Sequence, residues 1–118
     1  MDLQGSKGEH GWVHPEAQVS PAARVAGPVY VGPGCRVDAD AILGPGTVLV
    51  RDAVVEAKAR VEQSILWPGA RIEAEARLHD CVLGPGVRIG RSATLRSATL
   101  GEGTVLSDFS RLEGASTA

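Results

Sequence analysis

The side chains that could carry catalysis or bind a metal are few in this sequence, and they lie far apart. Its 118 residues include three histidines, His10, His14 and His79, and two cysteines, Cys35 and Cys81. Histidine serves as a general base or a metal ligand near neutral pH, but a catalytic zinc ion needs three protein ligands brought together. His10 lies in a polar N-terminal segment, and His14 and His79 each follow an aliphatic residue. We therefore predict surface positions for these histidines, and no catalytic, cofactor-binding or metal-binding residue.

Glycine-rich segments could form a phosphate-binding loop, but here the glycines stand in the wrong context. Gly5, Gly8 and Gly11 have no strand before them and no helix after them, as a nucleotide-binding loop requires. Later glycines form triplets with proline, such as Gly32-Pro33-Gly34, and this combination is typical of tight corners. We predict corners rather than phosphate sites, and no cofactor.

The composition argues against several classes of protein. Twelve Lys and Arg residues stand against 14 Asp and Glu, a net charge of −2, whereas a nucleic-acid-binding domain normally carries a basic excess. No apolar run approaches the ~20 residues of a membrane span, and residues 1–12 lack the apolar stretch of a signal peptide. Two cysteines without such a signal are typical of a reducing compartment. We expect a cytoplasmic protein with free thiols and with neither nucleic acid nor membrane as a partner.

Aliphatic residues recur at a fixed spacing over most of the chain, and this repeat predicts the fold. Successive Val, Ile or Leu residues stand six positions apart, with steps of five at 61→66, 78→83 and 95→100. A period of six, grouped in threes, describes a prism of three flat parallel sheets joined by short corners. The positions of this inner column are Val13, Val19, Val25, Val31, Val37, Leu43, Leu49, Val55, Val61, Leu66, Ile72, Leu78, Leu83, Ile89, Leu95, Leu100, Leu106 and Leu112.

Two further columns support this register. The residue two positions before each inner-column residue after Val13 is small or β-branched, as Ala59 is before Val61. Residues two apart in a strand face the same side, so a large and a small side chain share the interior. Three positions after many aliphatic residues stand glycine or aspartate, which tolerate the left-handed backbone of a sharp corner. These predicted corner residues are Gly34, Asp40, Gly46, Asp52, Gly69, Gly86 and Gly103.

Together the columns predict an all-β fold, a parallel β-helix of triangular section with about six coils of 17–18 residues. We predict a polar flexible leader over residues 1–12, the β-helix over 13–113 and a short tail over 114–118.

The repeat resembles that of the hexapeptide-repeat proteins, which implies a left-handed prism. Two stretches, Ala23–Gly32 and Ala59–Gly69, are similar to the C-terminal β-helix of bacterial nucleotide-sugar pyrophosphorylases, especially mannose-1-phosphate guanylyltransferases. In those enzymes catalysis resides in an N-terminal α/β domain, whereas only twelve residues precede the first inner-column residue, Val13, here. The resemblance therefore implies a non-catalytic oligomerisation or docking domain, with a separate nucleotidyltransferase domain or chain as a partner.

The same repeat leaves an enzymatic alternative open. Many hexapeptide-repeat proteins are acyltransferases, in which a histidine, often on a loop that projects from the prism, acts as general base. The uninterrupted repeat leaves no room for such a loop around His79, so the alternative is a small acyltransferase whose active site is completed between subunits. The stretch Leu78–Gly84 also resembles the zinc-binding stretch of γ-class carbonic anhydrases, but Glu75 stands where that family has another histidine. We therefore predict no zinc site.

Outward-facing positions distinguish the three predicted sheets. On the second and third sheets they are mostly charged or polar, as at Arg71 and Arg77, which predicts solvated surfaces. On the first sheet they are apolar, although a solvent-facing sheet normally alternates apolar and polar residues. We predict that this sheet forms the interface of a homo-oligomer, most simply a dimer, with a trimer as the alternative. The predicted interface residues are Trp12, Tyr30, Val48, Val50, Ile65, Trp67 and Val82.

Overall fold

A computed structural model of the chain describes residues 12–114. Within them, eighteen short strands and no helix are present, so the predicted all-β class is confirmed. Apart from Trp12 and Gly114, the predicted leader and tail lie outside the described residues. None of the described residues belongs to a helix long and apolar enough to cross a membrane.

The strands form three parallel sheets, and each coil contributes one strand to each sheet. The first sheet contains β1 (Trp12–Val13), β4 (Val29–Val31), β7 (Thr47–Leu49), β10 (Ile65–Leu66), β13 (Val82–Leu83) and β16 (Thr99–Leu100). The second contains β2 (Gln18–Val19), β5 (Arg36–Val37), β8 (Val54–Val55), β11 (Arg71–Ile72), β14 (Arg88–Ile89) and β17 (Val105–Leu106). The third contains β3 (Arg24–Val25), β6 (Ile42–Leu43), β9 (Arg60–Glu62), β12 (Arg77–His79), β15 (Thr94–Arg96) and β18 (Arg111–Glu113).

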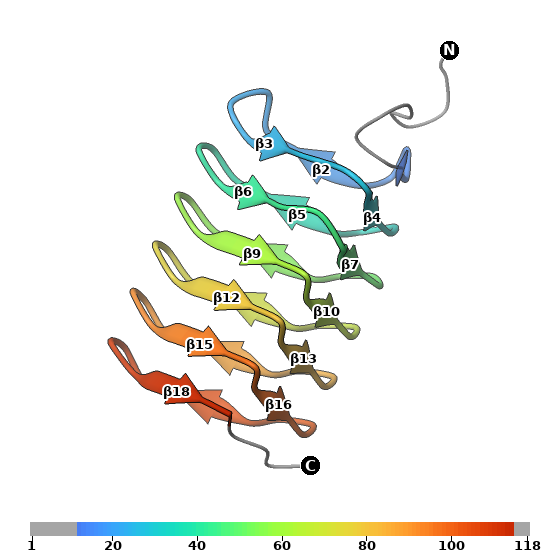
Figure 1. Cartoon of the computed structure of the whole chain (residues 1–118). Coiled ribbons are helices and arrows are strands. Elements are labelled where there is room, and N and C mark those ends of the chain that lie inside the picture. Colours follow the sequence, from blue (N-terminus) through green and yellow to red (C-terminus); the bar gives the residue numbers. More distant parts are fainter. Residues whose placement is uncertain (1–11, 115–118) are drawn as a thin grey trace.

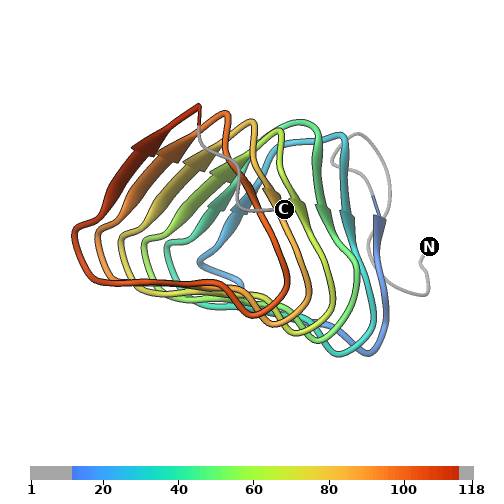
Figure 2. The same cartoon turned by 90° about the horizontal axis from the view of Figure 1, so that it is seen from below.

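The chain visits the three sheets in turn and then begins the next coil, which lies directly against the previous one (Figure 1). Viewed along its axis, the molecule is a triangular prism whose walls are the three sheets (Figure 2). From the N-terminal to the C-terminal end the coils wind in the left-handed sense (Figure 1). The fold is therefore the left-handed parallel β-helix that the repeat and the resemblance predicted.

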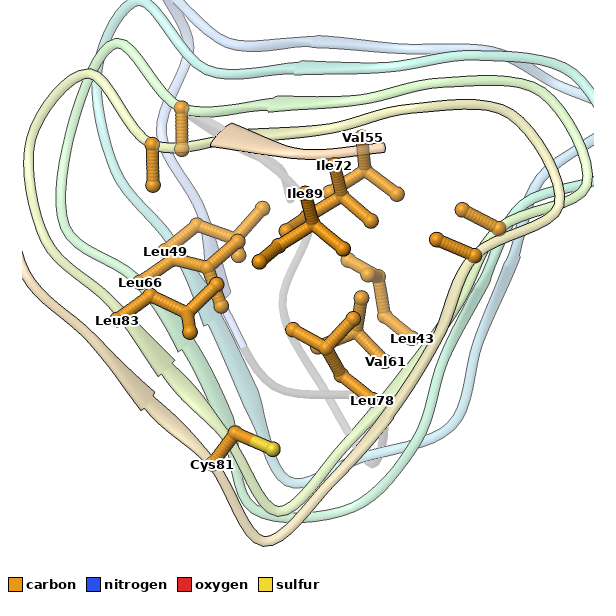
Figure 3. Close-up of a cluster of buried hydrophobic side chains, with 14 of the residues drawn as sticks. Leu43, Leu49, Val55, Val61, Leu66, Ile72, Leu78, Cys81, Leu83 and Ile89 are labelled. Atoms are coloured by element: carbon orange, nitrogen blue, oxygen red, sulfur yellow. The ribbon is translucent and has the colours of Figure 1, made fainter. Parts of the chain in front are cut away.

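The core is the predicted inner column together with its small partners. Ile72 pairs in register with Val55 on one side and Ile89 on the other, and Figure 3 shows these three side chains stacked in one file. All inner-column residues from Val31 to Leu100 are buried, whereas those of the end coils, such as Val13 and Leu112, are only partly buried. The predicted register is confirmed.

The corners also follow the prediction and extend it. The five predicted corner glycines have φ between 70° and 82°, and Asp40 and Asp52 are also left-handed. Further left-handed corners, which the sequence did not single out, are Lys58, Gln63, Glu75, Asp80, Ser92, Ser97, Phe109 and Gly114. At many corners the backbone N–H donates to a carbonyl of the preceding coil, for example Lys58 to Ala39 at 3.2 Å. This repeated bond offsets the ~1–2 kcal/mol cost of a left-handed non-glycine residue.

Candidate functional site

The outward side chains of the first sheet form a continuous apolar surface, here called the first-sheet face. One row follows the strand register from Trp12 through Tyr30, Val48 and Ile65 to Val82. The rings of Trp12 and Tyr30 stack with centroids 5.3 Å apart. The predicted interface residues in this row are therefore brought together on one wall of the prism.

A second row of the first-sheet face contains the remaining two predicted residues, Val50 and Trp67. Glycines flank them in the neighbouring coils, at Gly32 and Gly84. A Cβ atom on Gly32 would collide with the carbonyl oxygen of Val50, so that position cannot carry a side chain. Trp67, which is 45% exposed, has Gly84 as its neighbour in the next coil, so no side chain covers it on that side.

Exposure is concentrated on three of the predicted residues. Besides Trp67, these are Tyr30, which is 39% exposed, and Ile65, which is 36% exposed. The other four predicted residues are half-buried, namely Trp12, Val48, Val50 and Val82. Large aromatic side chains that keep this much surface in water are typical anchors of protein–protein interfaces.

Two exposed apolar residues were missed from the sequence. Val105 is 65% exposed on β17, and Phe109 is 70% exposed at the next corner. Val105 pairs in register with Arg88, which was assigned to the outer surface of the second sheet. The repeat spacing alone could therefore have placed Val105 on the same outer surface. Both belong to the last coil, and neither lies on the first sheet.

Apart from Val105, the outer surface of the second sheet carries the charged side chains that were predicted. Arg36 contacts Asp38 at 2.9 Å, and Arg71 contacts Glu56 at 2.6 Å across successive coils. Ion pairs of this exposed kind contribute little stability, ~0–1 kcal/mol each, but they neutralise the surface.

The third sheet carries the histidine that chemistry would most readily use. His79 is half-buried on β12, with its Nδ1 3.4 Å from Glu62 Oε1. Arg60 also donates to Glu62, at 3.0 Å. Burial opposes the ionisation of Glu62, but the hydrogen bonds from Arg60 and His79 outweigh it and lower the pKa of this carboxyl. No loop projects from the prism between residues 12 and 114, so His79 remains on an open strand.

The cysteines occupy the inner small column, as predicted, and are free thiols. Cys35 and Cys81 are both buried, and Cys81 Sγ lies 3.3 Å from the carbonyl oxygen of His79. Burial raises the pKa of both thiols, which disfavours the thiolate form needed for reactivity. Within the described part of the chain, no three His, Cys, Asp or Glu side chains are grouped to hold a metal ion.

A known protein family matches most of the β-helix. The family described as "GMPPB C-terminal domain" matches residues 25–116, more than half of the chain. The chain belongs to this family. The predicted resemblance to the C-terminal domain of nucleotide-sugar pyrophosphorylases is thereby confirmed. No curated protein matches the sequence.

Acetyltransferases are among the solved structures to which this chain is similar. A variant of GDP-perosamine N-acetyltransferase from Caulobacter crescentus, in complex with CoA and GDP-perosamine, is 27% identical with a TM-score of 0.83 over 89% of this chain and 51% of its own. The acetyltransferase domain of PglB from Neisseria gonorrhoeae is 27% identical with a TM-score of 0.77, over 80% of this chain and 48% of its own. The present chain thus spans about half the length of these proteins.

Proposed function

We propose that this β-helix is a non-catalytic oligomerisation or docking domain of a sugar-1-phosphate nucleotidyltransferase, and that its first-sheet face binds a second copy of the chain. The observation that carries the proposal is the apolar outer surface of a sheet that should otherwise alternate. Membership of the GMPPB C-terminal domain family supports the link to nucleotidyltransferases. The buried free thiols fit a cytoplasmic setting.

The dimensions of the face explain why its apolar character runs along the whole sheet. Coils ~4.8 Å apart and about six residues per side give one wall of the six-coil prism roughly 600 Å². A specific interface usually buries about 800 Å² per partner. That figure exceeds the flat area of the wall, so a partner has to use the whole of it, from Tyr30 near one end to Val82 toward the other.

The pattern of large and small side chains on the first-sheet face is self-complementary. A two-fold axis along the strand direction, between the third and fourth coils, would keep all six coils in the interface. It would seat Trp67 over Val50 of the partner subunit, Ile65 over Val48 of the partner subunit and Tyr30 over Val82 of the partner subunit. Because a two-fold interface uses the same patch on both chains, each large side chain then lies opposite a smaller one in both halves at once.

The test is the mass in solution of the parent and of a Trp67→Glu, Ile65→Lys double variant, measured by light scattering. We expect a parent of twice the 12.2 kDa chain mass and a folded, monomeric variant. Val105→Glu is the matched control, because it removes an exposed apolar side chain from another sheet and should leave the mass unchanged. A monomeric parent at high concentration, or a double variant with the parent's mass, contradicts the proposal. A trimeric parent that the double variant dissociates supports the face but refutes the two-fold arrangement.

A second candidate function, acetyl transfer between subunits, is favoured by the His79–Glu62 contact. A carboxylate that holds one imidazole nitrogen leaves the other available as a general base. The acetyltransferases of similar fold support the same idea. The discriminating assay is thiol release from acetyl-coenzyme A in the presence of an amino sugar. We expect no turnover, whereas turnover that disappears in His79→Ala would replace the first proposal with this one.

A further inference from the structure

The outer surface of the third sheet gathers arginines in its last three coils. Arg77 and Arg111 are the register neighbours of Thr94, one in the coil before it and one in the coil after. Arg96 lies two residues beyond Thr94 on β15 and so faces the same side of the sheet. These four residues, here called the arginine cluster, lie on the wall of β12, β15 and β18 that faces the viewer in Figure 1.

On the second sheet, by contrast, a regular geometry neutralises arginines. Arg71 pairs with Glu56, and Arg88 pairs with Glu73. In both cases the carboxylate lies in the preceding coil, two residues beyond the register neighbour of the arginine. An arginine of the second sheet is thus neutralised when that diagonal position holds an acid that has no other partner. Arg36 and Arg60 pair instead with an acid two residues further along the chain.

The arginine cluster fails this condition at both ends. The diagonal position for Arg111 is occupied by Arg96, another cation. The diagonal position for Arg77 is occupied by Glu62, which is already bound by Arg60 and a histidine. Glu113 lies two residues beyond Arg111 and in register with Arg96, but no carboxylate of residues 12–114 forms an ion pair with Arg77, Arg96 or Arg111.

The surface is hollowed where these arginines meet. Thr94 lines three adjoining hollows, one shared with Arg77 and Arg96, one with Arg77 and Arg111, and one with Arg96 and Arg111. The short side chain of Thr94 therefore forms a floor, and the longer arginines form the walls around it.

Other charges at the rim leave the cluster positive. Lys58 lines one of the hollows together with Glu75, and Glu113 lines another. Ser92 donates a 3.4 Å hydrogen bond to Glu75. Arg60 and Glu62 line the third hollow, so five Lys or Arg side chains against three carboxylates surround the threonine.

We propose that the arginine cluster is a binding site for a diphosphate group. The planar guanidinium fork matches pairs of phosphate oxygens, and arginines from three successive coils can reach both phosphates of one ligand above Thr94. The hollows are open to solvent, so salt screening weakens the attraction, and the site suits a ligand with several negative charges. The source is either inorganic pyrophosphate or the diphosphate of a nucleotide.

The test is calorimetric titration of the whole chain with pyrophosphate, GDP and inorganic phosphate in low-salt buffer. We expect pyrophosphate to bind with a dissociation constant below about 1 mM, and inorganic phosphate to bind more weakly. An Arg77→Gln, Arg111→Gln double variant should weaken binding at least about tenfold. The matched control is Arg71→Gln, Arg88→Gln, which removes the same charge from the second sheet and should change binding less than about twofold.

The outcomes distinguish a specific diphosphate site from non-specific attraction to positive charge, and a nucleotide source from an inorganic one. GDP binding that is tighter than pyrophosphate and lost in the same variant supports the site with a nucleotide as its source, and equal binding supports it with the inorganic ion. Absence of binding, equal weakening in the two double variants, or tighter binding of inorganic phosphate overturns the proposal. The Trp67→Glu, Ile65→Lys variant should still bind pyrophosphate, so failure of the interface proposal leaves this test intact.

Discussion

The first and second sheets share one construction and differ on their outer surfaces. Ile65 and Leu66 occupy β10 as Arg71 and Ile72 occupy β11, with the second residue of each pair buried. The first residue faces outward, and it is apolar in one sheet and ion-paired in the other. Since both sheets fold in the same way, the inner residue explains the fold, while the outer residue explains what each wall of the prism can bind.

The largest effect is expected from changing an inner residue of the second sheet. Ile72→Ala removes buried volume between Val55 and Ile89 and should lower the free energy of unfolding by about 2–5 kcal/mol. Ile72→Asp places an unpaired charge in the core and should prevent folding. Circular dichroism and chemical denaturation measure both, and a soluble, fully folded aspartate variant would contradict the assigned register.

A smaller effect is expected from adding a side chain at Gly32, a glycine on the outer surface of the first sheet. The new methyl group of Gly32→Ala meets the backbone oxygen of Val50, a residue whose N–H donates to the next coil, so the cost should reach about 3 kcal/mol. Gly86→Ala is the control, because its Cβ would meet nothing within 4 Å and only its left-handed φ is unfavourable. Its cost should be about 1 kcal/mol. Equal losses in denaturation experiments would show that the glycine is not required by close approach.

A still smaller effect is expected at Arg71, the outward neighbour of Ile72. Arg71→Ala breaks an exposed ion pair with Glu56, so the free energy of unfolding should fall by no more than about 1 kcal/mol. The contrast with Ile72→Ala, one residue away, measures how far the inner and outer surfaces differ in energy. A loss as large as that of Ile72→Ala would mean that the outer surface also holds the coils together.

The smallest effect is expected on the third sheet at acid pH. The pKa of Glu62 is lowered in the folded chain from its ordinary 4.5. Its contribution to stability is therefore complete above pH 4.5 and is lost as the pH falls through the lower, folded pKa. The parent should lose this small part of its stability on acidification, and Glu62→Gln should show a shallower dependence. Identical pH profiles for the two proteins would exclude the contribution.

Much of the fold could be predicted because the repeat is local and redundant. The steps of six and five residues predicted the sheet and coil of strands such as β11 and β12. The prediction was incomplete at the corners, where several left-handed residues were not expected from the sequence. Lys58 and Phe109 take left-handed φ values that their side chains do not favour, because the N–H of each bonds to the preceding coil.

The candidate surfaces show the same division. Alternation along single strands was sufficient to place Ile65 and Trp67 on one outer wall, since neighbouring residues of a strand face opposite sides. The neutralisation of Arg71 depends instead on a diagonal neighbour in the preceding coil, Glu56, fifteen residues earlier. That relation arises only when the coils are stacked in register, because ion pairing depends on distance in space. The charged hollow around Thr94 therefore emerges from the stacking of three coils and from no single one of them.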